Sequence, residues 1–219
     1  MLRSAPWSRA QKDAAVARGP HPSAIEHCTF LRGEMFEMCR RGQWFVLPYS
    51  LVRDITALRI SPPGVVPQRE RRPRTIVDYT FSGVNGDTVK LAPVEAMQFG
   101  TAFFRILSRI FFADPRWGPV YQLKADVADG FYQVKVALRD IVKLGLVMPG
   151  IDGVPDPDPL IAFPMALPMG WVESPPSFCV CTETGADVAN AALRARVPAA
   201  PHRHDDLATL CLTNSQILM

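Results

Sequence analysis

Asp126 is the residue of this sequence whose type and setting best suit catalysis. It ends the apolar run Tyr121–Asp126, and the turn Val127-Ala128-Asp129-Gly130 follows, so we predict a carboxylate at the end of a strand. Phosphoryl transfer between nucleotides needs divalent cations, and carboxylates are the hard oxygen ligands that such cations prefer. In an alternative reading, Asp126 or Asp129 caps the turn through its own backbone amides. Asp126 alone leaves both readings open.

Four arginines in six residues form a second candidate group, Arg69-Glu70-Arg71-Arg72-Pro73-Arg74, between two extended segments. The planar guanidinium matches phosphate oxygens in bidentate geometry, so a hairpin that carries these side chains could hold a triphosphate or a template backbone. A solvated basic loop is the alternative. The formal charge of the whole chain is only +3, so any phosphate binding must be local.

The third candidate is the run LPMGWVESPPSF, residues 167–178. Gly170 permits close approach of another backbone, and the helix predicted from Ser174 offers free amides at its N-terminus. A plain strand-to-helix connection is the alternative here.

The elements that must position these groups are mixed, which predicts an α+β fold. We expect helices over 23–41, over 93–114 as part of the core, and over 174–196. Strands are expected at 44–47, 65–66, 74–79, 121–126, 131–136, 143–148 and 160–163, with an exposed loop over 149–159. Residues 1–22 are interpreted as a disordered tail and 197–219 as a poorly ordered one, so that one domain spans 23–196.

Composition and cysteine usage narrow the class of protein. With 48% hydrophobic and 21% charged residues the chain is globular, and five cysteines without regular spacing favour a reduced, intracellular protein. No signal peptide or transmembrane segment is predicted. A zinc site of Cys179, Cys181, His202 and His204 is disfavoured, because residues two apart on a helix point to nearly opposite sides.

The order of the three groups resembles a known family. LKADVADGFYQVKV is similar to the first carboxylate motif of reverse transcriptases, LPMGWVESPPSF to their second motif, and RPRTIVDYTFSGVN to the fingers strand upstream. The resemblance is closest to gypsy-like retroelements and covers roughly residues 30–190. It implies the fingers and partial palm of a right-hand polymerase.

The resemblance assigns roles to the first motif. Asp126 would ligate catalytic Mg²⁺, and Val127 would lend its backbone carbonyl. Asp129 and Gly130 would lie under the incoming triphosphate. Phe131 would stand against the sugar, where a bulky ring excludes a 2′-hydroxyl and so selects deoxynucleotides.

The resemblance also assigns roles outside that motif. Arg74 would pack over the triphosphate, Arg69 would take the place of a phosphate-binding lysine, and Met169 and Gly170 would border the nucleotide and the templating base. The family's second metal ligands come from an aromatic-x-Asp-Asp hairpin. Asp205 and Asp206 are weak candidates for it, because a proline-rich segment rather than an apolar strand precedes them.

The function expected from this resemblance is RNA-directed DNA polymerisation, magnesium-dependent in the intact enzyme, with an RNA or DNA template-primer and deoxynucleoside triphosphates as partners. The chain is expected to be truncated after the second palm motif and inactive alone. A catalytically dead, nucleic-acid-binding remnant is the alternative. The expected location is the cytoplasm.

Overall fold

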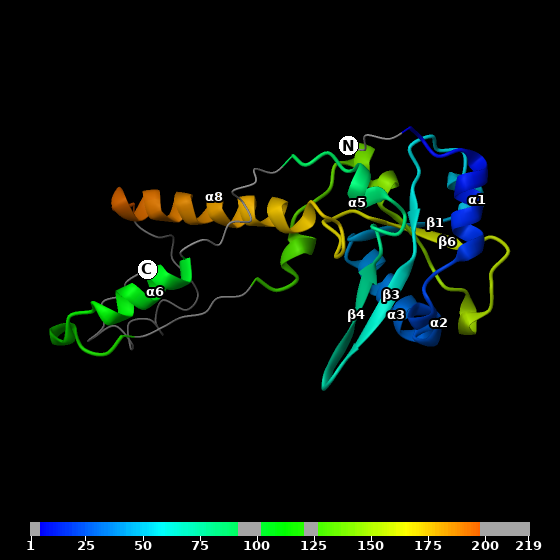
Figure 1. Cartoon of the computed structure of the whole chain (residues 1–219). Coiled ribbons are helices and arrows are strands. Elements are labelled where there is room, and N and C mark those ends of the chain that lie inside the picture. The colour runs from blue at the N-terminus through cyan, green and yellow to red at the C-terminus, as the bar shows by residue number, and fades with distance from the viewer. Residues whose placement is uncertain (1–4, 92–101, 121–126, 198–219) are drawn as a thin grey trace.

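The computed structural model describes residues 5–91, 102–120 and 127–197 and has the predicted α+β fold (Figure 1). Its strands form a four-stranded sheet, in the order β1-β6-β5-β2, and a separate hairpin of β3 and β4. The strands are β1 (Trp44–Pro48), β2 (Ile60–Ser61), β3 (Pro63–Gln68), β4 (Arg71–Val77), β5 (Gly145–Val147) and β6 (Leu160–Pro164).

Helices precede, separate and follow these strands along the chain. The α-helices are α1 (Arg9–Arg18), α2 (Pro22–Glu26), α3 (Cys28–Arg40), α4 (Tyr49–Val52), α5 (Val84–Asp87), α6 (Ala102–Phe111), α7 (Leu138–Ile141) and α8 (Ser174–Arg194). The 3-10 turns are η2 (Pro115–Trp117), η3 (Gly130–Gln133), η4 (Val142–Leu144) and η5 (Ile151–Gly153).

The sheet is mixed, and its two central strands, β5 and β6, are buried on both faces. β6 pairs antiparallel with β1 and with β5, whereas β2 pairs with β5 in parallel. Side chains alternate along β6, so that Ala162 joins one apolar cluster while Ile161 and Phe163 join another. The first cluster is completed by α3 and the hairpin, and the second by α4 and α1. Burial on both faces explains why these strands read as continuous apolar runs.

The prediction of a disordered tail over residues 1–22 is wrong for α1. Ser8 and Gln11 form a reciprocal capping box at the start of this helix. The helix then docks through polar groups: the Lys12 ammonium donates to the carbonyls of Arg53 and Ile55, at 3.1 and 2.7 Å. Because α1 docks through these polar contacts together with only two apolar side chains, Ala15 and Val16, the sequence shows no apolar period here.

The strand predicted over residues 131–136 is also wrong. The chain instead makes the turn η3, and only an isolated bridge joins Lys135 to Ala166. Asp129 adopts a left-handed conformation with φ of 52°, which turns the backbone before a strand can begin. The strand predicted over 121–126 lies outside the described residues.

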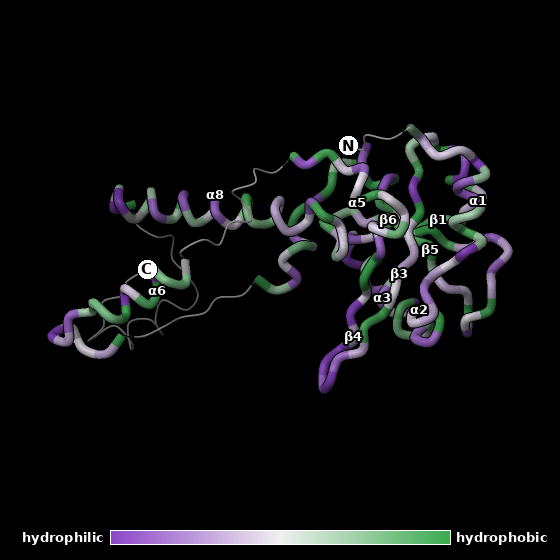
Figure 2. The backbone as a smooth tube through the Cα atoms, in the orientation of Figure 1, coloured by the Kyte–Doolittle hydropathy of each residue, from purple (hydrophilic) through white to green (hydrophobic). Residues whose placement is uncertain are grey.

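The helix predicted over 93–114 is confirmed for its described part, α6, but its predicted place in the core is wrong. Its apolar side chains are exposed, with Phe103 and Phe111 at 72% and 80%. Figure 1 shows α6 and the outer part of α8 extending away from the sheet, and Figure 2 shows apolar positions along α6. Among the described residues, no helix is both long and apolar enough to cross a membrane.

Candidate functional site

Asn85 joins two of the segments that the sequence singled out. Its side-chain amide donates to the carbonyl of Gly170 at 3.0 Å and to the Thr80 hydroxyl at 2.9 Å. Its side-chain oxygen accepts from the amide of Val172 at 2.9 Å. A side chain that satisfies backbone groups on both sides of Trp171 fixes this loop against the segment after β4.

Gly170 makes a second contact between this loop and the chain at the end of β4. We call the Asn85 and Gly170 contacts together the junction. Gly170 has φ of 100°, and a Cβ built on it would lie 2.2 Å from the carbonyl oxygen of Val77 in β4. Only glycine accepts both the conformation and the closeness. β4 and the loop that contains Gly170 are therefore in direct backbone contact.

Further hydrogen bonds hold the loop and the start of α8. The Trp171 indole donates to the Thr88 hydroxyl at 3.1 Å, and the Ser174 hydroxyl donates to the carbonyl of Pro168 at 2.7 Å. Glu173 is buried and accepts from the amide of Leu91 at 3.0 Å. Hydrogen bonds thus hold the chain at five successive positions, 170 to 174.

An open groove of about 370 Å³ runs beside the junction, and we call it the Gly170 groove. It is lined by both hairpin strands, by the segment Asp78–Thr80, by Gly170 and by His21 and Ser23. The His21 ring lies 3.2 Å from the Asp78 carboxylate at one side of this groove. Met169, which precedes Gly170, is partly buried. Two predicted site residues, Met169 and Gly170, thus stand at or next to a surface that could receive a planar base.

The arginines lie on the hairpin as predicted. Arg69 and Glu70 form its tip, and Glu70 has φ of 55°. Figure 2 shows that the tip is hydrophilic and projects from the body of the molecule. Arg72 pairs with the buried carboxylate of Glu34, whereas Arg69 and Arg74 are exposed and have no ion-pair partner within the described ranges. Arg71 is likewise exposed.

The first carboxylate motif is described only in part. Asp126 lies outside the described residues, as do Asp205 and Asp206, so the three predicted metal-binding carboxylates have no structural account. Val127 is exposed. Elsewhere in the described part of the chain, His, Cys, Asp and Glu side chains form no group of three that could hold a metal ion.

The described residues of that motif contact the run LPMGWVESPPSF. The Phe131 ring meets the Phe178 ring edge to face, with centroids 5.4 Å apart. A Cβ on Gly130 would lie 2.7 Å from the Phe178 ring, so a larger residue here would displace that ring. The Asp129 carboxylate lies 3.2 Å from the guanidinium of Arg41 at the end of α3. Phe131 and Gly130 are therefore placed at the start of α8, while Asp129 is held by a residue that the motifs did not indicate.

Two ionisable side chains near this motif, Glu37 and Tyr132, have shifted pKa values. Hydrogen bonds from Arg40 and Arg41 lower the pKa of Glu37 to about 2. Burial raises the pKa of the Tyr132 hydroxyl to about 12, and the nearby Glu34 and Asp129 carboxylates act in the same direction. These groups keep one charge state across the physiological pH range.

Sequence reasoning missed Asn85, Arg41 and His21. The Asn85 amide reaches a carbonyl 85 positions away, which no local pattern indicates. Arg41 is the last residue of an expected helix and one of two consecutive arginines, and nothing local links it to Asp129. No known family model matches the sequence, and no curated protein shows significant similarity to it.

Proposed function

We propose that this chain forms the fingers and front palm of an RNA-directed DNA polymerase. The observation that carries the proposal is the double contact of Asn85 and Val77 with the Gly170 loop. Two segments that resemble separate reverse transcriptase motifs meet there as one surface with a groove beside it.

In this proposal the Gly170 groove receives the templating base, and the exposed Arg69 and Arg74 bind phosphates. Asp126 and the carbonyl of Val127 would hold Mg²⁺, which lowers the pKa of an attacking hydroxyl and neutralises developing charge. Phe131 would lie against the sugar and exclude a 2′-hydroxyl.

Binding measurements on the 219-residue chain test the proposal. The probe is a labelled DNA primer on an RNA template, ended with a dideoxynucleotide so that no bond can form. We expect fluorescence anisotropy to show binding that tightens when Mg²⁺ and the complementary deoxynucleoside triphosphate are added. Asp126→Asn should abolish that tightening. Phe131→Ala should allow the matching ribonucleotide to tighten binding to the same extent as the deoxynucleotide does.

The alternative is a nucleic-acid-binding protein without catalysis. The observation that favours it is the pairing of Asp129 with Arg41, because this contact occupies the carboxylate that would face the triphosphate. In that case the template-primer binds, but Mg²⁺ and the nucleotide change nothing. Absence of template-primer binding would contradict both functions.

A triple variant separates hairpin binding from general charge. Replacing Arg69, Arg71 and Arg74 by Gln should lower the slope of log affinity against log salt by about 2 to 3, at about 0.7 to 0.9 per lost phosphate contact. The matched control replaces Arg139, Arg194 and Arg196, which are exposed on α7 and at the end of α8. It removes the same charge and should keep the wild-type slope.

A further inference from the structure

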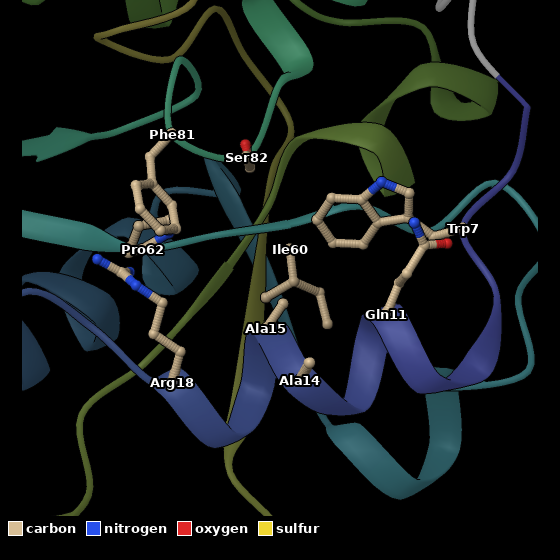
Figure 3. Close-up of a pocket in the computed structure, with 9 residues that line it drawn as sticks. All are labelled: Trp7, Gln11, Ala14, Ala15, Arg18, Ile60, Pro62, Phe81 and Ser82. Carbon is tan, nitrogen blue, oxygen red and sulfur yellow. The ribbon is translucent and has the colours of Figure 1, made fainter.

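A second pocket, of about 280 Å³, lies between α1 and the turn after β4, and we call it the α1 pocket. Figure 3 shows the rings of Trp7 and Phe81 on opposite sides of it, with Ile60, Ala14 and Ala15 between them. Two aromatic walls over an aliphatic floor suit a flat ring. The volume is small, so one ring system fits better than an extended chain.

Arg18 supplies the charge of this pocket. Its guanidinium carbon lies 3.6 Å from the centroid of the Phe81 ring. Stacking uses the face of the guanidinium and leaves its in-plane N–H donors available. No carboxylate pairs with Arg18 within the described ranges, so an anion would complete this group.

We propose that the α1 pocket binds a nucleotide, with the planar base between Trp7 and Phe81 and the phosphate on Arg18. A nucleotide joins a flat aromatic ring to an anion, which is the combination that the two rings and the free guanidinium present. Base–aromatic stacking and guanidinium–phosphate pairing are the usual sources of affinity for such a ligand.

The walls of the pocket are held before any ligand arrives. The buried guanidinium of Arg59 lies 4.8 Å from the centroid of the Trp7 ring and donates to the carbonyl of Ala5 at 2.7 Å. On the other side, the amide of Phe81 donates to the Asp78 carboxylate at 2.8 Å. A preformed site avoids the entropic cost of ordering its side chains on binding.

Gln11 adds a polar group to the lining. Its side-chain oxygen accepts from the amide of Ser8 at 2.8 Å, which is the capping contact of α1. This bond leaves the N–H donors of the Gln11 amide available for acceptor atoms on a base edge.

Calorimetric titration of the 219-residue chain tests the site with three probes: AMP, adenosine and inorganic phosphate. We expect AMP to bind at least tenfold more tightly than either half of it, because the base and the phosphate contact separate groups. Equal binding of AMP and adenosine would overturn the proposal, as would no binding of AMP.

Variants locate the binding. Arg18→Gln and Phe81→Ala should each weaken AMP about tenfold, the range of one phosphate pair or one stacked base. Matched controls are Arg9→Gln on the same helix and Phe36→Ala on α3, both exposed and outside the pocket. Equal weakening by the controls would overturn the site. Phe81 is 58% exposed, so its loss should leave the fold intact, and circular dichroism checks this.

Two sources of the ligand share this chemistry, a free nucleotide and a nucleotide within a single strand. A short oligo(dA) titrated against the wild type and Arg18→Gln distinguishes them: an Arg18 effect on both probes indicates a strand, and an effect on AMP alone indicates a free nucleotide. The inference does not rest on the proposed polymerase function. The hairpin triple variant should therefore bind AMP as the wild type does, and loss of AMP binding in it would overturn the assignment to this pocket.

Discussion

Gly170 is the residue of the junction that tolerates substitution least. Its φ is 100°, and its Cα lies too close to the Val77 carbonyl for a side chain to fit. We expect Gly170→Ala to lower the free energy of unfolding by about 1 to 3 kcal/mol or more, since strain and overpacking act together. Urea denaturation followed by circular dichroism measures the change.

Gly185 is the matched control, because it lies within α8 and a Cβ there would meet nothing within 4 Å. Gly185→Ala should raise helix stability by about 0.5 to 1 kcal/mol. If both alanine variants had the same effect, the close approach at Gly170 would not exist in solution.

The lowered pKa of Glu37 predicts how the stability of the protein depends on pH. Hydrogen bonds from Arg40 and Arg41 lower this pKa from 4.5 to about 2. A carboxyl whose pKa is lower in the folded state stabilises the fold fully above its unfolded pKa, and this stabilisation is lost as the pH falls through the folded pKa. The melting-temperature difference between wild type and Glu37→Gln should therefore be present at pH 6 and vanish near pH 2.

The control for this carboxyl is Glu183→Gln on α8, where Glu183 is exposed. Its difference from the wild type should stay small and constant over the same pH range. A Glu37→Gln difference that grew on acidification would contradict the pairing with Arg40 and Arg41.

At the scale of elements, α1 depends on one buried ammonium. Lys12 is 4% exposed and donates to two carbonyls just after α4. Lys12→Met keeps the length of the side chain and leaves both carbonyls unpaired, which should cost about 1 to 3 kcal/mol of stability. Chemical denaturation measures this cost.

Lys90→Met provides the comparison, because Lys90 is exposed and makes no contact of this kind in the described part of the chain. It should change stability by less than about 0.5 kcal/mol. Equal effects of the two substitutions would mean that α1 is not docked as described.

Elements with local signals could be predicted from the sequence. The helical spacing over 23–41 and its stop at Gly42, with φ of 64°, correspond to α2 and α3, although His27 divides them. Ser174 and Pro175 marked the start of α8, and apolar runs marked β1 and β6. In each case the residues that decide the element lie within it.

Elements that depend on distant partners could not be predicted. α1 is held by carbonyl groups about 40 positions away, and Gly130 packs against the ring of the distant Phe178. The candidate site divides in the same way: the motifs were visible as runs of residues, whereas the Asn85 contact that joins them was not.

At the scale of the whole molecule, the described chain has a packed part and an unpacked part. The sheet and its two clusters are buried, whereas residues 181–191 of α8 and most of α6 are exposed. Local stability follows burial, because elements with few buried contacts open without global unfolding. Hydrogen–deuterium exchange should therefore be slow in β1, β5 and β6 and fast in α6 and outer α8. Slow exchange in α6 would show that its apolar side chains are covered in solution.

The pairing of β1 with β6 has a consequence for folding during synthesis on the ribosome. Leu160 follows its partner Pro48 by 112 positions, so a ribosome adding about 5 to 20 residues per second makes β6 some 6 to 22 s after β1. During that interval the edge of Trp44–Pro48 that pairs with β6 in the folded protein has no neighbour. The nascent chain must keep this strand from pairing elsewhere until β6 has been synthesised, which makes the segment around β1 a natural client for a chaperone.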